Sequence, residues 1–447
     1  MRCALRSSSS TCADGLEPAH YDGCANNRGS VASKLLKGLV PAPLRQPMRR
    51  GVLFLVPPLQ RRLTRTWRRR NRLKRRVGRV RKRLNRLRRK QLRALKDVWL
   101  NTWLSMWYVR RGNRSVRSSN QIHLVNPLQD YTGSPQRTLH LFDALKDHAE
   151  VCLWSEHKVP PEIARKYPVK RIAAWRFRFP KAGTLVIVGS LSIGPWIHYA
   201  RPRRTIFVQN STYMTPGRFR QRLRYISNGG RREVEVAYAS ELTKRMAGNH
   251  PGYVQPSLID LDRFVPAPSK KEPSGSSSGA FTVGRLSRAD PLKHHPEDAA
   301  LYRRLVEEGC RVRIMGPSPS LEAELGGLES ATLLPMFAEE AHLFLQGLDC
   351  FFYRTSEEFV EPSGRVITEA MACGLPVVCH ESGGYAEWIE HGHNGFLFES
   401  QQEALEILLG LKEDRALRER VGREARRTAE ELFSDVVRSE IVEFYLR

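Results

Sequence analysis

The sequence predicts an α/β protein with two Rossmann-like domains that face a cleft, preceded by a basic helical segment. Three observations lead to this prediction. Short apolar runs alternate with amphipathic stretches from about residue 120 onward, and one stretch rich in Pro, Ser, Gly and Lys, residues 266–279, interrupts that alternation. Residues 61–96 carry 20 Lys or Arg and no Asp or Glu. Alternating strands and helices imply parallel sheets with right-handed crossovers, and the interruption divides them into two domains.

The first part of the chain separates into a tail and a basic segment. Residues 1–60 are predicted to form a disordered tail, because they begin with a stretch rich in Ser, Gly, Asn and Cys. Residues 61–118 are predicted to form a basic amphipathic helix, in which apolar residues recur four and three positions apart from Leu73 to Leu87. Without residues 61–96 the formal net charge falls from +28 to +8, so the high pI describes one segment.

This basic helix has three interpretations that the sequence leaves open. It is a solvated basic coil or coiled coil, a contact with an anionic membrane, or a contact with nucleic acid. Adjacent aromatic residues, Trp99, Trp103, Trp107 and Tyr108, favour the membrane surface, because basic and aromatic side chains together form an interfacial anchor. A polybasic helix also binds phosphates without sequence specificity, but no base-reading motif accompanies this one.

The remaining chain is divided by its strand and helix patterns. Residues 119–265 are predicted to form the first Rossmann-like domain, 266–280 a linker, 281–430 the second domain and 431–447 a C-terminal helix. The expected strands lie at 122–125, 151–154, 184–189, 205–210 and 235–240, and then at 280–284, 311–316, 332–336, 349–354 and 375–379. Ligands of such folds bind at the carboxyl ends of the strands.

Composition excludes several classes of protein. The eight cysteines show no CxxC and no zinc-finger spacing, which is typical of reduced thiols in a cytosolic protein. Cys373 and Cys379 are expected to be small buried apolar residues. No apolar stretch approaches the ~20 residues that span a bilayer, and residues 1–30 lack the order of a secretory signal.

Two carboxylates stand eight positions apart in EPSGRVITEAMACGLPVV, residues 361–378. Glu361 precedes a helix that is predicted to begin near Ser363, and Glu369 lies about two turns into it, so both are expected on one side. The amides of Ser363 and Gly364 would lie at the positive end of the helix dipole. This arrangement suits a ligand with hydroxyl groups and an anion. The alternative is a pair of glutamates that only stabilises the start of the helix.

Together with other stretches, this one resembles the Glu-x7-Glu signature of the family 4-like retaining glycosyltransferases, the glycosyl transferases group 1. The other stretches are PSLIDLDRFVPAP (256–268), VGRLSRADPLKHHPED (283–298) and SGGYAEWIEHGHNGFLF (382–398). The resemblance extends over about 120–447 and is strongest in the C-terminal half. It implies a GT-B fold, with an acceptor domain at 119–265 and a nucleotide-sugar donor domain at 281–430.

The resemblance also implies roles for charged residues. Arg285 and Lys293 resemble the pair that holds the donor diphosphate, and Arg288 is the substitute for Lys293, since the spacing is longer than the family's commonest form. Fixed cations stabilise a departing diphosphate. Glu361 matches the glutamate that touches the transferred sugar, and Glu369 the one that binds the ribose. Arg285, Lys293 and Glu361 are therefore expected to be catalytic.

Backbone positions complete the expected donor site. Ser363, Gly364 and Gly284 resemble donor-binding positions of the second domain. In the first domain, the family's Gly-Gly loop is reduced to YTGSPQRT, with Gly133 alone. Glycine there can still bring backbone close to a phosphate at a helix start.

Other positions depart from the family pattern. Gln209 and Asn210 stand where a histidine is often found near the anomeric carbon, and Leu258 replaces the usual glycine of the hinge. A divergent or inactive member therefore stays an alternative. Asp260 and Asp262 form an Asp-x-Asp pattern, but they are expected to cap a turn rather than bind a metal.

The resemblance implies a nucleotide-sugar-dependent hexosyltransferase that retains anomeric configuration. Its acceptor is expected to be a saccharide or a lipid-linked molecule, in envelope glycan or polysaccharide synthesis. No metal or other cofactor is expected. The protein is expected in the cytoplasm, peripheral on the inner face of the cell membrane through the basic helix. Two alternatives remain: a nucleic-acid-binding protein with an inactive GT-B scaffold, and a nucleotide-sugar epimerase or phosphorylase.

Overall fold

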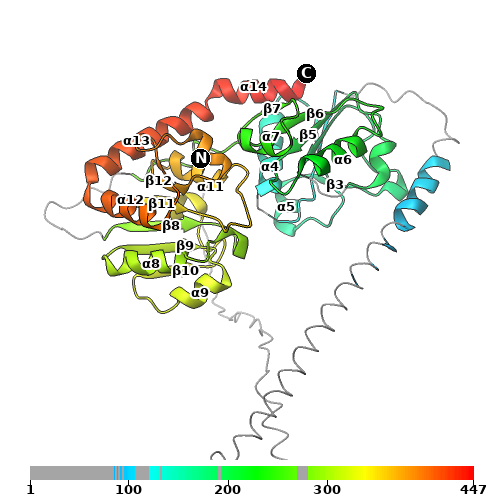
Figure 1. Cartoon of the computed structure of the whole chain (residues 1–447). Helices are drawn as coiled ribbons and strands as arrows, with labels where there is room; N and C mark the ends of the chain where they lie inside the picture. The colour runs from blue at the N-terminus through cyan, green and yellow to red at the C-terminus, as the bar shows by residue number, and fades with distance from the viewer. Residues whose placement is uncertain are drawn as a thin grey trace, which may run out of the picture. The chain divides into compact units, whose positions relative to one another are not determined.

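The computed structural model describes residues 85, 88, 91, 92, 95–106, 120–130, 133–189, 193–268 and 280–447. The predicted tail, most of the predicted basic helix and residues 269–279 of the predicted linker lie outside the described residues. Leu92–Arg447 form one compact unit, and that unit is described below. Figure 1 shows its helices packed along two sheets.

The first domain contains a seven-stranded parallel sheet with the strand order β3-β2-β1-β4-β5-β6-β7. Its strands are β1 (Ile122–Val125), β2 (Val151–Ser155), β3 (Val169–Arg171), β4 (Thr184–Val188), β5 (Arg204–Gln209), β6 (Glu235–Tyr238) and β7 (Tyr253–Val254). Its helices are α4 (Gly133–Leu145), α5 (Pro161–Lys166), η2 (Ala174–Arg176), η3 (Pro195–His198), α6 (Pro216–Ile226) and α7 (Glu241–Met246). The central strand β4 is buried along its whole length, because helices cover both faces of a parallel sheet.

The second domain contains a six-stranded parallel sheet with the order β10-β9-β8-β11-β12-β13. Its strands are β8 (Thr282–Leu286), β9 (Arg311–Met315), β10 (Ala331–Leu334), β11 (Cys350–Tyr353), β12 (Val377–His380) and β13 (Phe396–Phe398). Its helices are η4 (Pro291–Lys293), α8 (Asp298–Glu307), α9 (Pro319–Leu325), α10 (Ala341–Gln346), α11 (Arg365–Ala372), η5 (Gly384–Trp388), α12 (Gln401–Glu413) and α13 (Arg415–Leu432).

Two helical segments from outside the two sheets pack on the first domain. The last helix, α14 (Asp435–Leu446), buries Tyr445 there, and the Gln255 side chain donates a hydrogen bond of 2.7 Å to its hydroxyl. Helical residues 95–106 lie near the other end of the described chain and bury Leu104 in the same core as strands β4 and β5. Residues 95–106 of the predicted basic helix are therefore part of the folded unit.

Most predicted strands are present within one or two residues of their expected bounds. The strands missing from the prediction are β3, β7 and β13. They are three, two and three residues long, and each lies at the edge of its sheet. Edge strands this short carry too little apolar pattern to be recognised. Helix α4 begins at Gly133, within the stretch YTGSPQRT that was expected to form a loop, because the polar start of the helix hides its period.

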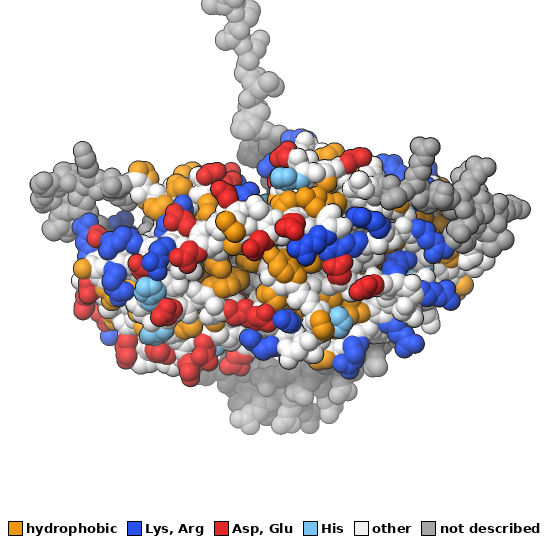
Figure 2. Space-filling model, turned by 90° about the horizontal axis from the view of Figure 1, so that it is seen from above, with side chains coloured by type: hydrophobic (Ala, Val, Ile, Leu, Met, Phe, Trp, Pro, Cys, Tyr) orange, Lys and Arg blue, Asp and Glu red, His pale blue; other side chains and the backbone are white. Residues whose placement is uncertain are grey.

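Charge is distributed differently in the folded part than in the basic segment. Figure 2 shows acidic and basic side chains interspersed on one face of the described residues. This agrees with the modest charge that the sequence assigns to the chain outside residues 61–96.

Candidate functional site

The predicted charged residues of the second domain lie where its strand order reverses. Strands β8 and β11 are neighbours in the sheet, yet β9 and β10 extend from one side of the pair, and β12 and β13 from the other. Arg288 and Lys293 follow β8, whereas Glu361 follows β11. Two loops that leave neighbouring strands in opposite directions form a crevice for ligands in open parallel sheets.

Glu361 is the centre of a nearly buried polar cluster. The Lys293 ammonium donates a hydrogen bond to Glu361 Oε2, and the Tyr353 hydroxyl donates another at 2.7 Å. The side chains of Lys293 and Glu361 are 12% and 13% exposed. Burial opposes ionisation of Glu361, but Lys293 and the two hydrogen bonds outweigh burial, so the pKa of Glu361 lies below its usual value. The cluster therefore keeps Glu361 as a carboxylate at neutral pH.

Arg285 lies beneath this cluster and is fully buried. Its guanidinium lies 3.4 Å from the Asp298 carboxylate, packs 4.6 Å over the ring of Tyr353 and donates a hydrogen bond to the Lys293 carbonyl. Burial alone lowers the pKa of this arginine, yet Tyr302 and Asp298 raise it above the usual value. The resemblance predicts that Arg285 holds a diphosphate. In the structure its guanidinium holds the backbone that carries Lys293.

Gly284 and Arg288 have contrasting surroundings. A Cβ on Gly284 would lie 2.3 Å from a methyl carbon of Leu348, so this glycine lets strand β8 pack closely against the turn between α10 and β11. Arg288 is 43% exposed along its side chain and lies 3.6 Å from Asp290. Of the predicted diphosphate ligands, Arg288 and Lys293 are the two whose charged groups lie nearest the surface.

Glu369 has a different partner from Glu361. Its buried carboxylate lies 2.6 Å from the Arg365 guanidinium one helical turn earlier, and that guanidinium also donates a hydrogen bond to the Gln136 amide of the first domain at 2.5 Å. Burial raises the pKa of Glu369, against the opposing effect of Arg365. Glu369 thus lies in an ion pair that continues into the first domain.

The turn between the two glutamates depends on its glycine. Gly364 has φ of +62° and caps α11, and a Cβ there would lie 2.5 Å from the Tyr385 ring. Ser363 is buried beside it. The Gly384 amide donates a hydrogen bond of 2.9 Å to the Glu361 carbonyl, so the loop at Gly383 and Gly384 supports the backbone of the turn.

The first domain adds hydrogen bonds to the same turn. The Thr212 hydroxyl donates to the Val360 carbonyl at 2.6 Å, and the Ser240 hydroxyl donates to the Pro362 carbonyl at 2.5 Å. Both donors follow the carboxyl ends of strands of the first sheet, β5 and β6. The backbone around Glu361 is therefore held from both domains.

The residues that form this site lie in a part of the chain that matches a known family. Residues 268–428 match the family described as glycosyl transferases group 1. These residues contain the whole cluster around Lys293 and Glu361. The family match therefore covers the second domain.

Two curated relatives are similar to part of this chain. Spore coat protein SA of Bacillus subtilis is 41% identical over 81 residues, which are 17% of this chain and 22% of that protein. The D-inositol 3-phosphate glycosyltransferase of Arthrobacter sp. is 31% identical over 194 residues, 38% of this chain and 44% of that protein. The chain thus spans less than half the length of either relative.

Solved structures extend the similarity to both domains. HepE of Anabaena, in a crystal structure described as a complex with UDP and glucose, matches with a TM-score of 0.57 and 18% identity. The match covers 72% of this chain and 98% of HepE. The two parallel sheets are those of a GT-B fold, which confirms the predicted fold class.

The predicted glycine of the first domain begins a helix. Gly133 is the first residue of α4, with φ of +30°, and a Cβ there would meet no described atom within 4 Å. The next residue, Ser134, accepts a hydrogen bond of 2.7 Å from the buried Asn126. Gln209 is also buried and donates to the Ser211 carbonyl, so its amide is engaged within its own loop.

Sequence reasoning missed three aromatic residues around Glu361. Tyr353 donates to Glu361, and Phe359 packs 4.3 Å from the Lys293 ammonium. Tyr213 of the first domain lies 5.6 Å from Phe359 between ring centroids, and it is 50% exposed. The position of Tyr213 just after strand β5 was the available signal, since loops at strand ends line ligand sites in such folds.

Several further predictions concern single residues. Asp260 caps a turn as expected, because its carboxylate accepts hydrogen bonds from the amides of Asp262 and Arg263 at 3.1 and 3.2 Å. Cys373 and Cys379 are buried, as predicted.

Within the part of the chain that the structure describes, no group of His, Cys, Asp and Glu has metal-binding geometry, and no helix is long and apolar enough to cross a membrane.

Proposed function

We propose that this protein is a retaining glycosyltransferase that moves a sugar from a nucleotide-sugar donor to a saccharide or lipid-linked acceptor. The observation that carries the proposal is the nearly buried pair of Lys293 and Glu361 at the strand-order reversal of the second sheet. This pair lies in the part of the chain that matches the group 1 family.

The cations near this pair would act on the leaving diphosphate. When the bond from the anomeric carbon to the diphosphate breaks, negative charge grows on the phosphate oxygens. Lys293 and Arg288 are the cations near the surface of the site, and each would stabilise that charge. Removing one preorganised donor of this kind typically slows a reaction by about 10²–10³-fold.

The two glutamates would bind hydroxyl groups of the donor. Glu361 stays ionised and would accept hydrogen bonds from the transferred sugar, which fixes the anomeric carbon near the acceptor. Glu369 would bind the ribose. Arg285 would act as a positioning residue, since its guanidinium binds the Lys293 carbonyl from a buried position.

The acceptor and its location belong to the same proposal. Aromatic and basic residues of the segment over 61–118 favour an anionic membrane surface, where a lipid-linked acceptor would be met. We therefore expect the protein on the cytoplasmic face of a membrane, in envelope glycan or polysaccharide synthesis. We also expect transfer to proceed without a bound metal, so that EDTA leaves the rate unchanged.

The first experiment is a thermal-shift panel of nucleoside diphosphates and nucleotide sugars. UDP and UDP-glucose, which structures of HepE contain, come first. A stabilising nucleotide should lose its effect with Arg288→Ala, whereas Arg218→Ala, an exposed arginine of α6, serves as the matched control. Arg285→Ala is less suitable here, because loss of a buried guanidinium would destabilise the domain itself.

The panel also separates the proposal from its alternatives. Stabilisation by a nucleotide sugar, followed by transfer of its sugar with retained configuration, supports a glycosyltransferase. Release of free sugar phosphate from the donor or isomerisation of its sugar would indicate a phosphorylase or an epimerase instead. No response to any nucleotide, together with tight binding of nucleic acid, would favour the scaffold interpretation.

A further inference from the structure

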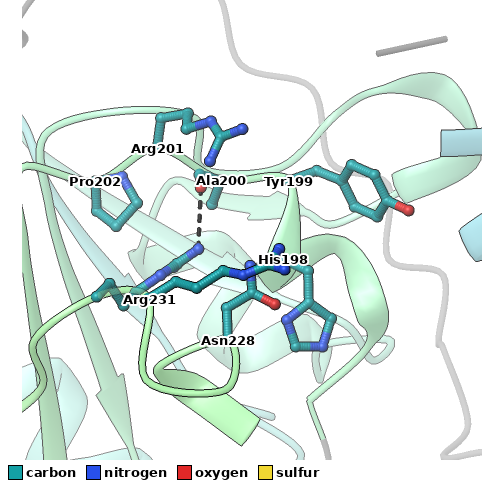
Figure 3. Close-up of a pocket in the computed structure, with 8 residues that line it drawn as sticks. His198, Tyr199, Ala200, Arg201, Pro202, Asn228 and Arg231 are labelled. Carbon is teal, nitrogen blue, oxygen red and sulfur yellow. Dashed lines mark hydrogen bonds between the residues drawn. The ribbon is translucent and has the colours of Figure 1, made fainter. Parts of the chain in front are cut away.

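A basic cavity lies on the first domain, away from the strand ends that face the donor site. Its volume is about 300 Å³. Its walls are the loops that precede strands β5 and β6, and these loops enter the sheet at the amino ends of its parallel strands. Figure 3 shows the lining side chains on these loops. They are His198, Tyr199, Ala200, Arg201, Pro202, Asn228, Arg231 and Arg232.

The charged residues that line this cavity are all basic. Three of its lining residues, Arg201, Arg231 and Arg232, are arginines, and none is an acid. Among the described residues, no carboxylate lies within ion-pair distance of Arg231 or Arg232. Arg231 and Arg232 therefore have no described carboxylate that balances their charge, and a bound anion would do so.

One of these arginines is fixed in place before any ligand binds. The Arg232 guanidinium donates hydrogen bonds to the carbonyls of Ile197 and Ala200 at 2.9 and 3.1 Å, the second of which is the dashed line in Figure 3. Its other terminal nitrogen is buried and has no hydrogen-bond partner among the described residues, and the same holds for His198 Nδ1. Unsatisfied buried nitrogens at a basic cavity favour a ligand that supplies hydrogen-bond acceptors.

An exposed aromatic helix adjoins the cavity. The hydroxyl of Tyr199, one of the lining residues, donates a hydrogen bond of 2.8 Å to the Asn101 carbonyl within helical residues 95–106. On that helix, Trp99, Trp103 and Met106 are 60%, 42% and 54% exposed. Exposed indoles beside cations are typical of protein surfaces that enter the interface between lipid and water.

We propose that this cavity binds the phosphate group of an anionic membrane lipid, while the exposed side chains of residues 95–106 enter the adjacent lipid interface. The arginines select a phosphate, and the indoles and the methionine select a lipid over a soluble phosphate. The site is separate from the donor site, so the inference does not depend on glycosyl transfer. It adds a specific lipid contact to the diffuse attraction expected of the basic segment.

The test is vesicle binding by the full chain at about 0.15 M salt, where exposed charges are partly screened. Phosphatidylcholine vesicles with and without phosphatidylglycerol are compared by flotation. The cavity variant is R201Q/R231Q, which spares Arg232 and its structural hydrogen bonds. The matched control is R218Q/R220Q, which removes the same charge from exposed positions of α6.

The expected result is selective loss of binding in the cavity variant. Its affinity for phosphatidylglycerol vesicles should fall about 25-fold, since each of the two arginines near an anionic surface contributes about fivefold. The control should lose less than about fivefold, and unchanged melting temperatures of both variants would show that they are folded. Trp99→Ser should also weaken vesicle binding, without changing stabilisation by inorganic phosphate.

Three outcomes would overturn the inference. Equal losses in the cavity variant and in the control would mean that attraction to the membrane is only diffuse. If the unmodified protein is stabilised by inorganic phosphate, fails to bind vesicles, and loses that stabilisation in the cavity variant, the ligand would be a soluble phosphate. Loss of RNA binding in the cavity variant, with vesicle binding intact, would mean a nucleic-acid site.

Discussion

The ion pair of Lys293 and Glu361 provides the sharpest test of the site. We consider Glu361→Gln and Lys293→Met, alone and together. Glu361→Gln keeps the volume and an acceptor for the Tyr353 hydroxyl, so it removes only the charge. Each single variant leaves one charged group nearly buried without its partner, whereas the double variant leaves none.

The magnitude follows from burial and contact. Breaking a fully buried ion pair from one side costs about 3–5 kcal/mol, because the remaining charge is left uncompensated. The two side chains are 12% and 13% exposed, so water reaches them to some extent, and each single variant should cost roughly 2–3 kcal/mol. The double variant should be more stable than the sum of the single losses predicts, by about 2 kcal/mol.

The assay is urea unfolding at neutral pH, with sugar transfer measured in the same samples. Stability should be partly restored in the double variant, but transfer should not be, because both groups would contact the donor. Additive stability losses within about 0.5 kcal/mol would show that the two groups do not interact as described. Restored transfer in the double variant would refute the proposed contacts with the donor.

Three further predictions concern the same domains. Arg285→Met should cost about 2 kcal/mol of stability, because the buried Asp298 carboxylate loses one arginine partner and keeps Arg354, whereas Arg288→Ala should change stability by less than about 0.5 kcal/mol and weaken nucleotide binding about tenfold. Gly364→Ala should cost at least about 2 kcal/mol, because φ is +62° and the new Cβ meets an aromatic ring. Burial lowers the pKa of His123 to about 4 and that of His294 to about 3, so stability should be full above pH 6.5 and fall as pH drops below it.

Each of these predictions has a direct control. Arg285→Met and Arg288→Ala are compared by melting temperature and nucleotide titration, and equal destabilisation of both would contradict the buried position of Arg285. Gly133→Ala is the control for Gly364→Ala, because open space surrounds Gly133, and it should cost less. For the histidines, the loss should reach on the order of 3 kcal/mol for each by pH 4. A melting temperature that stays constant from pH 7 to pH 4 would exclude this effect.

Prediction from sequence succeeded where local pattern and burial agree. Strands such as β4 are continuous apolar runs, and a parallel sheet buried on both faces demands such runs. The carboxylates at Glu361 and Glu369 were recognised by their spacing before a helix. That both glutamates bind one ligand stays a prediction. In the structure Glu361 pairs with Lys293, and Glu369 pairs with Arg365.

Other features escaped because they depend on residues far apart in the chain. The hydrogen bond from Tyr353 to Glu361 is visible in the sequence only as an eight-residue spacing. Tyr213 lies beside Phe359 in the structure, although more than a hundred residues separate the two in the sequence. The basic cavity joins two loops whose arginines are separated by strand β5 and helix α6, and no local pattern connects them.

The sequence by itself determined the two-domain α/β architecture, the position of the two glutamates and the basic segment, because period, turn residues and charge are local properties. Only the tertiary structure decided which cation reaches the surface of the site. Arg285 and Lys293 differ little in sequence context, yet the fold buries the first against Asp298 and directs the second to Glu361. The physical reason is that strand order and packing depth are set by contacts between distant residues, and these contacts decide whether a charge faces a ligand or the protein interior.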